Sequence, residues 1–413
     1  MNHRSRRKSR LAVVFCLTAF AAIALSVTLK AHAQFMGKSA ATMQFESNSN
    51  VFNLNTGMPL STGSDSRRGD TFLGYGARFD LEYQLGRQQF FASASTTEFN
   101  YQRHTDLNHN DYRLDAGLKW QLAELLDGKV DVMRTHSMVP FYDLSGTALS
   151  LETQQREEAV IGLKVTPEWR VEGDAYTSKL DEPIRESPNL RLTENSGRVT
   201  VNYSGLSRFT GGVYAGYLSG SYGGTNANGI YVNGVNFVAN PDYRQYAGGF
   251  ATTYKSPRAT IEGQLGYTKR TSTTGSDDTS GVTGLFSLRE QLTYKTNIRF
   301  EVSRAIQSYL LNSGSEIDST IGVTAEWQAT YKLAVTLGYT YTYRDYPGQG
   351  NDPVGSERVD IQSAAHLTLD YRPRRWISIR PYANLLWRIS NFIGGEFNSN
   401  IFGLYVTLQT PDK

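Results

Sequence analysis

Apolar and polar side chains alternate along much of this chain, one residue at a time. In the segment 334–344, Val, Leu and Tyr occupy the odd positions, and Ala, Thr, Gly and Arg occupy the even ones. Successive side chains of a β-strand point to opposite faces, so this segment is predicted to be a two-faced strand of about ten residues. Strands of soluble proteins usually have about five or six residues, whereas a tilted strand needs about nine to eleven to cross a bilayer.

The same alternation returns in the segments 112–121, 361–372 and 377–390. A water-soluble sandwich would alternate in the same way, so the pattern by itself does not select a membrane protein. The connections do, because short turns alternate with longer polar stretches along the chain, as in outer-membrane barrels. We expect the short turns at 85–87, 126–128, 165–167, 204–206, 255–257, 295–297, 331–332 and 372–374.

The predicted fold is therefore all-β, a transmembrane antiparallel up-and-down β-barrel with short periplasmic turns and longer external loops. We count about eighteen strands, with about sixteen as the alternative, and an even number returns both ends of the barrel to the periplasm. Aromatic side chains beside the short turns are typical of the interfacial girdle of such barrels. They are Tyr83, Trp120, Trp169, Tyr203, Tyr254, Tyr294, Tyr331, Tyr371 and Trp376.

The N-terminal segment has the order of a secretory signal peptide. Basic residues come first, an apolar run follows from Leu11 to Leu29, and Ala31-His32-Ala33 forms a small-residue cleavage site. We predict a signal peptide over 1–33, export by the Sec route, and a barrel over 34–413 in the outer membrane of a Gram-negative bacterium. The single cysteine, Cys16, lies in the signal peptide, so no disulfide framework is expected.

Charge and chemistry-bearing residues point away from several other functions. The net charge of +3 over 413 residues does not indicate a nucleic-acid partner. No serine or aspartate stands in a pattern that would pair it with a base, and His104 and His109 around Asp106 fit a polar external loop better than a metal site. We therefore predict no enzyme activity, no cofactor and no metal.

Eighteen strands enclose more space than inward side chains fill, so a water-filled lumen is expected. Inward positions carry both signs of charge, which suits a neutral or weakly charged hydrophilic solute, and the arginines could also bind a uronate-bearing polymer. The lumen-lining candidates are Arg113, Arg198, Arg289, Arg299, Arg380, Arg388, Glu262, Glu326, Asp370 and Tyr382. The long segment 223–242 is expected either to fold inward as a constriction, with Tyr231, Asn233 and Phe237 as candidates, or to form a short hairpin around Asn233-Gly234.

Two segments resemble a known family. Phe45-Glu46-Ser47-Asn48-Ser49-Asn50-Val51-Phe52-Asn53-Leu54 is similar to the D-S-N-V-F-R-L signature of the EpsL-type outer-membrane proteins, β-barrel porins encoded in exopolysaccharide loci. Asn53 replaces the basic residue usual there. The segment 374–392 resembles the penultimate strand of that family.

The resemblance implies a part in exporting a bacterial exopolysaccharide, with an envelope polysaccharide-export machinery as partner beside the outer-membrane lipid. Two alternatives remain, a structural or adhesive barrel plugged by its own loops and a general nutrient porin for small hydrophilic solutes. The sequence does not indicate an oligomeric state.

Overall fold

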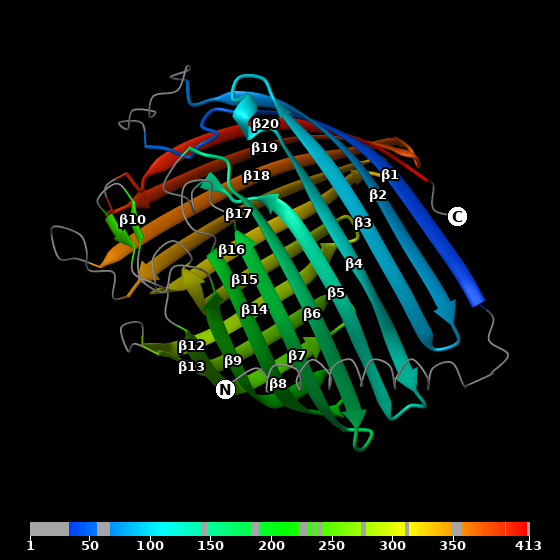
Figure 1. Ribbon diagram of the computed structural model, residues 1–413. Helices are drawn as coiled ribbons and strands as arrows, with labels where there is room; N and C mark the ends of the chain where they lie inside the picture. The colour runs from blue at the N-terminus through cyan, green and yellow to red at the C-terminus, as the bar shows by residue number, and fades with distance from the viewer. Residues whose placement is uncertain are drawn as a thin grey trace, which may run out of the picture.

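The computed structural model forms one closed barrel (Figure 1). It describes residues 33–55, 67–141, 147–182, 190–223, 230–232, 235–237, 242–273, 278–309, 314–347, 357–392 and 394–410. The predicted signal peptide lies outside this part of the chain, apart from Ala33, at which the first strand begins. Among the described residues, no helix is long and apolar enough to cross a membrane.

Eighteen antiparallel strands make up the wall, as the alternation predicted. They are β1 (Ala33–Asn48), β2 (Asp70–Leu85), β3 (Gln88–Tyr101), β4 (His109–Leu122), β5 (Leu126–Met138), β6 (Leu151–Lys164), β7 (Trp169–Glu182), β8 (Leu190–Leu206), β9 (Phe209–Gly223), β12 (Tyr243–Lys255), β13 (Ala259–Ser272), β14 (Thr279–Thr293), β15 (Thr296–Tyr309), β16 (Gly314–Thr330), β17 (Leu333–Tyr346), β18 (Arg358–Arg374), β19 (Ile377–Ser390) and β20 (Phe397–Gln409). A short 3-10 helix, Thr105–Leu107, lies between β3 and β4.

Each strand pairs with its neighbours in sequence, and β9 pairs with β12. The ring closes at a seam between β1 and β20, in which Ala40–Asn48 pair with Gln409–Ile401. Residues 33–38 of β1 extend beyond the seam, where the strand pairing is with β2. Both chain ends of the barrel lie at the end that carries the short turns, as an even strand number requires.

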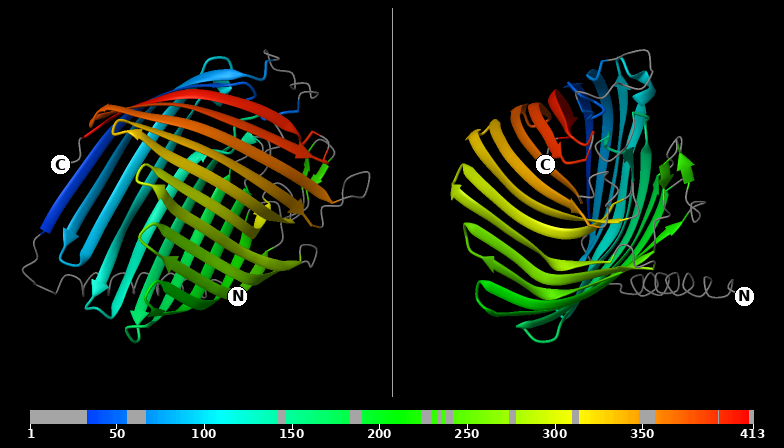
Figure 2. Two further views of the ribbon diagram at one scale, coloured as in Figure 1. Left: turned by 180° about the vertical axis from the view of Figure 1, so that it is seen from behind. Right: turned by 90° about the vertical axis from the view of Figure 1, so that its left-hand side faces the viewer.

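Figure 2 shows the wall of the barrel from two further sides. The outer face of this wall is apolar, because large hydrophobic side chains are exposed at alternate positions along the strands. In β2, Tyr75, Phe79, Leu81 and Tyr83 are exposed outward, and the intervening charged residues point inward. Of the nine predicted girdle aromatics, all but Trp120 have exposed side chains beside the short turns. This distribution is that of a barrel surrounded by lipid.

Four short turns lie one or a few residues from their predicted positions, and one of them is 295–297, because 296 and 297 already belong to β15. Residues 126–128 belong to β5, since the turn is at 123–125, where Ala123 has a positive φ of 53°. Residues 204–206 and 372–374 continue β8 and β18, and a register shift interrupts the pairing at each place. Pro373 therefore lies at an irregularity in β18, where the missing N–H of proline is tolerated.

The long segment 223–242 contains a two-stranded hairpin of β10 (Ile230–Val232) and β11 (Val235–Phe237). Residues 233–234, which include the candidate Asn233, lie outside the described residues. Tyr231 pairs with Asn236, and Phe237 pairs with Ile230. Figure 1 shows the hairpin at the end of the barrel with the long connections, and a constriction role for Tyr231, Asn233 and Phe237 stays a prediction.

Candidate functional site: the inner wall of the barrel

The ten lumen-lining candidates all occupy inner-face positions. Directly paired residues of an antiparallel sheet point to the same face, so the registers place every candidate opposite to the apolar outer face. They are Arg113 on β4, Arg198 on β8, Glu262 on β13, Arg289 on β14, Arg299 on β15, Glu326 on β16, Asp370 on β18, and Arg380, Tyr382 and Arg388 on β19. Their part in transport stays a prediction.

Some of these candidates are brought together. Arg289 and Arg299 lie directly opposite each other on β14 and β15, and Arg299 forms an ion pair with Glu301. The Tyr382 hydroxyl donates a hydrogen bond of 2.5 Å to Glu46 and accepts one of 3.0 Å from Gln44. Both partners belong to β1, so these bonds span β20 on the inner face.

A row of arginine–tyrosine stacks runs along the inner face from β6 to β13. The guanidinium carbon of Arg156 lies 3.6 Å from the ring centre of Tyr176. That of Arg198 lies 4.1 Å from the ring centre of Tyr214, and Arg198 also donates a hydrogen bond of 3.2 Å to Gln264. We call these contacts, together with the stack of Arg270 at 3.5 Å on Tyr243, the stacked row. Cation–π contacts hold both partners in fixed orientations, so the stacked row is an ordered polar surface.

The last stack of the row is buried. Tyr243 is 2% exposed, and its hydroxyl donates to Glu194 and accepts a 2.9 Å hydrogen bond from Ser308. Arg270 donates to Ser308 at 3.0 Å. The pairing register places Ser308 at an outer-face position of β15, yet its side chain contacts inner-face side chains of β12 and β13. Ser308, near the end of β15, is therefore displaced toward the lumen.

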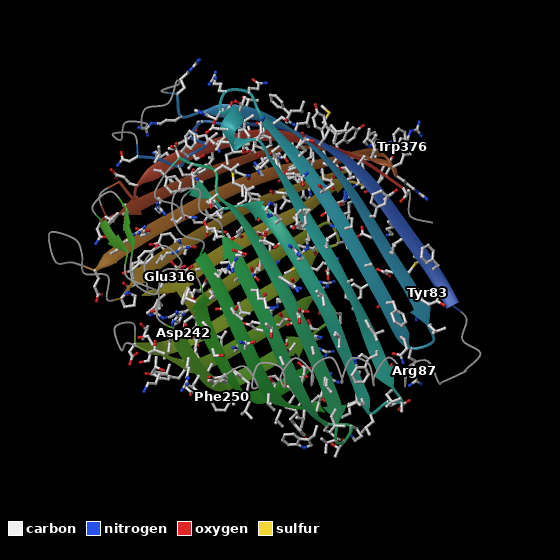
Figure 3. All side chains as sticks on the ribbon, in the orientation of Figure 1. Tyr83, Arg87, Asp242, Phe250, Glu316 and Trp376 are labelled. Atoms are coloured by element: carbon white, nitrogen blue, oxygen red, sulfur yellow. The ribbon has the colours of Figure 1, made fainter. Side chains whose placement is uncertain are left out.

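Ser315 on β16 shows the same displacement. Its hydroxyl lies 2.8 Å from that of Thr279, an inner-face residue of β14. Glu316, beside it, forms an ion pair with Arg344 at 3.6 Å. Figure 3 labels Glu316 and Asp242 at this end of the barrel, and Tyr83, Arg87 and Trp376 at the short-turn end. The long-connection end is thus narrowed by a wall hairpin.

A second inward-folded structure lies at the same end, against the inner face of β2 and β3. Six buried apolar side chains form what we call the mouth cluster: Val51, Phe52, Phe72, Tyr101, Leu107 and Phe141. They come from two strands and from the connections after β1, β3 and β5. Phe52 packs edge-on against Phe141 with ring centres 5.1 Å apart, and against His104 at 4.7 Å.

Asn50 holds the mouth cluster in place. Its side-chain amide donates to the carbonyl oxygens of Leu54 at 2.8 Å and Asn398 at 2.9 Å, and its side-chain oxygen accepts from the Leu54 N–H at 3.2 Å. Asn53 has a positive φ of 49°, a conformation that asparagine adopts more readily than most residues. The segment that resembles the EpsL-type signature is therefore a tight turn tied to β20.

A buried ionic cluster joins β17, β18 and β19 near this end. Asp360, 1% exposed, accepts hydrogen bonds from Arg358 at 2.6 Å, Ser390 at 2.5 Å and Tyr346 at 3.2 Å. Arg388 lies 3.8 Å from Asp360 and donates to the Gly395 carbonyl at 2.5 Å. The candidate Arg388 is thus 7% exposed and contributes to structure at the mouth, in contrast to a solvated lumen residue.

Sequence reasoning did not find the mouth cluster or the inward bend of β15–β16. The available signal for the cluster was Val51 and Phe52, two adjacent large apolar residues in the connection after β1. The described residues contain no group of three or more His, Cys, Asp and Glu side chains that could hold a metal ion. His109 lies in β4 and stacks on Phe99, with ring centres 4.9 Å apart.

Two polar cavities lie at the short-turn end. One, of about 430 Å³, lies at the seam and is lined by Lys38, Ser39, Ala40, Thr42, Arg78, Asp80, Arg380, Tyr405, Thr407, Gln409 and Thr410; we call it the seam cavity. The other, of about 440 Å³, lies across β2 to β6 and is lined by Gln84, Arg87, Gln89, Lys119, Trp120, Gln121, Asp127, Gly128, Lys129 and Val160. Cationic side chains outnumber carboxylates in both.

Comparison with known proteins agrees with a porin-like barrel. Residues 242–410, which contain β12 to β20, match the model of the family described as Putative beta-barrel porin 2. No match was found among curated proteins.

Solved barrels are similar at low identity. OpdK of Pseudomonas aeruginosa, solved with vanillate, is 10% identical, with a TM-score of 0.48 over 91% of this chain and 99% of that one. OccAB3 of Acinetobacter baumannii is 11% identical, with a TM-score of 0.46 over 91% and 99%. The siderophore receptor PirA of P. aeruginosa is 9% identical, with a TM-score of 0.45 over 91% and 80%. The chain is an eighteen-stranded barrel of the outer-membrane type, and its β12 to β20 are similar to the Putative beta-barrel porin 2 family.

Proposed function

We propose that this barrel is an outer-membrane channel that takes part in the export of a bacterial exopolysaccharide, with an envelope-spanning export machinery as its partner. The observation that carries the proposal is the stacked row. Arg156 and Arg198 lie on tyrosine rings of the inner wall and are partly exposed, within a surface that also holds carboxylates. The buried stack of Arg270 on Tyr243 supports the end of the row. A sugar chain offers hydroxyl groups that both donate and accept hydrogen bonds, and such a wall can satisfy both.

Other features support the same function. The alternating faces give a polar inner wall and an apolar outer one, as a water-filled channel requires. The description of the family that matches residues 242–410 names a porin. The resemblance of 45–54 and 374–392 to EpsL-type proteins suggests that the transported molecule is an exopolysaccharide. A passive nutrient porin would have similar physics, so direction of transport must be tested in cells.

The mouth cluster favours a second candidate, a barrel that its own connections close. Val51 and Phe52 are buried on the inner side of the wall and are held there by Asn50. Together with the bent β15–β16 hairpin, they narrow the long-connection end from two sides. A channel that opens only when its partners are present would have this arrangement.

Conductance of the refolded barrel in a planar bilayer tests the channel function. A steady open current, reduced by fragments of the polymer purified from the producing cells, is expected. Arg198→Ala should change that block, because it removes a guanidinium from the stacked row. Absence of current from a barrel whose folding is verified by its heat-dependent gel mobility would favour the closed-barrel candidate.

Export itself is tested by deleting the chain in the producing cells. We expect polymer to accumulate in the periplasm and to disappear from the medium. Normal secretion without the chain, together with impaired uptake of small sugars, would instead identify a nutrient porin.

A further inference from the structure

The seam cavity has the chemistry of an anion site. It lies where β1 and β20 close the barrel, at the short-turn end, and β2 and β19 supply its remaining walls. Lys38, Arg78 and Arg380 line it against one carboxylate, Asp80. Arg78 binds Asp80 through two hydrogen bonds of 2.8 Å, one from Nε and one from Nη2, which neutralises that carboxylate. Cationic side chains therefore outnumber carboxylates in the lining of the cavity.

Arg380 carries a hydrogen-bond donor whose acceptor is missing among the described residues. Its Nε atom is buried, and no acceptor lies within hydrogen-bond distance of it among the described residues. A buried donor without an acceptor costs about 1–3 kcal/mol, so such a group is commonly completed by a ligand or water. Arg380 lies directly opposite Tyr405 across β19 and β20, which places this donor beside an aromatic ring.

The aromatic part of the cavity is held rigidly. Tyr405 is stacked on Tyr382, with ring centres 5.0 Å apart and planes inclined by 25°. Tyr382 is fixed in turn by its hydrogen bonds to Glu46 and Gln44. Thr42 and Thr407 add hydroxyl groups that lie 3.4 Å apart within the same wall.

We propose that the seam cavity binds a carboxylate-bearing sugar unit of the exported chain. The planar guanidinium of Arg380 matches a carboxylate, the ring of Tyr405 offers an apolar face to the sugar ring, and the threonine hydroxyls pair with sugar hydroxyls. The cavity lies at the periplasmic end, so a chain leaving the cell meets it before the stacked row. This proposal rests on the proposed export function and names its substrate class as uronate-type polysaccharides.

Equilibrium binding to the folded barrel in detergent tests the site without requiring a current. The probes are a short oligogalacturonate and its methyl ester, which has the same chain without the charge. We expect the wild-type barrel to bind the acid and not the ester. Arg380→Gln should weaken binding of the acid about tenfold or more, the effect of one lost charge-assisted hydrogen bond.

Arg208→Gln is the matched control. Arg208 lies in the short turn between β8 and β9, on the opposite wall and at the same end of the barrel, and it does not line the cavity. This variant should bind the acid within about twofold of wild type, because an exposed, distant charge is screened by salt.

Two results would overturn the site: equal affinity for acid and ester, or equal losses in the two variants. The proposed function is judged separately, since an open current with no preference for the acid would remove the seam site and leave the channel.

Discussion

Replacing Asn50 by Asp should release the segment that narrows the mouth. The two side chains have the same shape, but an ionised carboxylate cannot donate the two hydrogen bonds that the Asn50 amide gives to the carbonyl oxygens of Leu54 and Asn398. Those oxygens would instead face a negative charge. Asn50 is 4% exposed, so water cannot replace the lost bonds without movement of the segment.

The size of the effect follows from these contacts. Two lost hydrogen bonds cost about 1 kcal/mol each, and burying an unpaired charge adds about 1–3 kcal/mol. The inward-folded arrangement should therefore lose about 3–5 kcal/mol, and each 1.4 kcal/mol changes an equilibrium about tenfold. The ratio of folded-in to released mouth should fall by about a hundredfold or more.

Single-channel recording measures the outcome. We expect a higher mean current and more frequent fluctuations from Asn50→Asp than from wild type. Acid should partly restore the wild-type behaviour, because burial favours the protonated carboxyl and this form regains one donor; the effect is lost as the pH rises. Asn110→Asp is the control, since it makes the same charge change at an exposed site at the same end of the barrel. An unchanged current from folded Asn50→Asp barrels would refute a mouth closed by this segment.

Two further substitutions test the assignment of the faces and of the mouth. Leu337→Arg places a charge on the lipid face of β17 and should destabilise the inserted barrel by about 2–4 kcal/mol. Thr336→Arg, at the neighbouring inner-face position, should be tolerated. Urea titration of folding into vesicles compares the two variants, and equal losses of stability would contradict the assignment of the two faces. Arg388→Ala should destabilise the barrel by about 2–4 kcal/mol, because it removes a cation beside the buried carboxylate of Asp360. The temperature at which the folded gel band is lost should therefore fall, whereas Arg380→Ala should leave this temperature nearly unchanged. A larger fall for Arg380→Ala would contradict the ionic cluster.

The strands and their faces could be predicted because both follow from a local rule. Val335, Leu337 and Tyr339 alternate with small polar residues, and each position fixes the face of the next. The turn positions were less certain, because irregular pairing extends strands past the residues that usually end them. The sequence predicts a turn at Pro373, but the register shift in β18 accommodates this residue within the strand.

The mouth could not be predicted in the same way. Phe52, Leu107 and Phe141 come from three connections, and their burial depends on contacts between parts of the chain that no local pattern relates. The segment 223–242 is long and partly apolar, whereas no pattern in the sequence indicates that Ser308 of β15 contacts Tyr243 on the inner face. Arg388 occupies an inner-face position in the alternation of β19, and only its contacts show that it lies beside the buried carboxylate of Asp360.

The seam between β1 and β20 also determines the order in which the barrel can be completed. It joins residues such as Ser39 and Thr410, which are 371 positions apart and hydrogen-bonded to each other. Every other joint of the wall lies between strands that follow one another in synthesis and can form early, but this one must wait for the last strand. Until then, β1 has an open edge, and residues 33–38 keep part of it after closure. The nascent barrel therefore has one site at which assembly can be guided, delayed or misdirected by another strand.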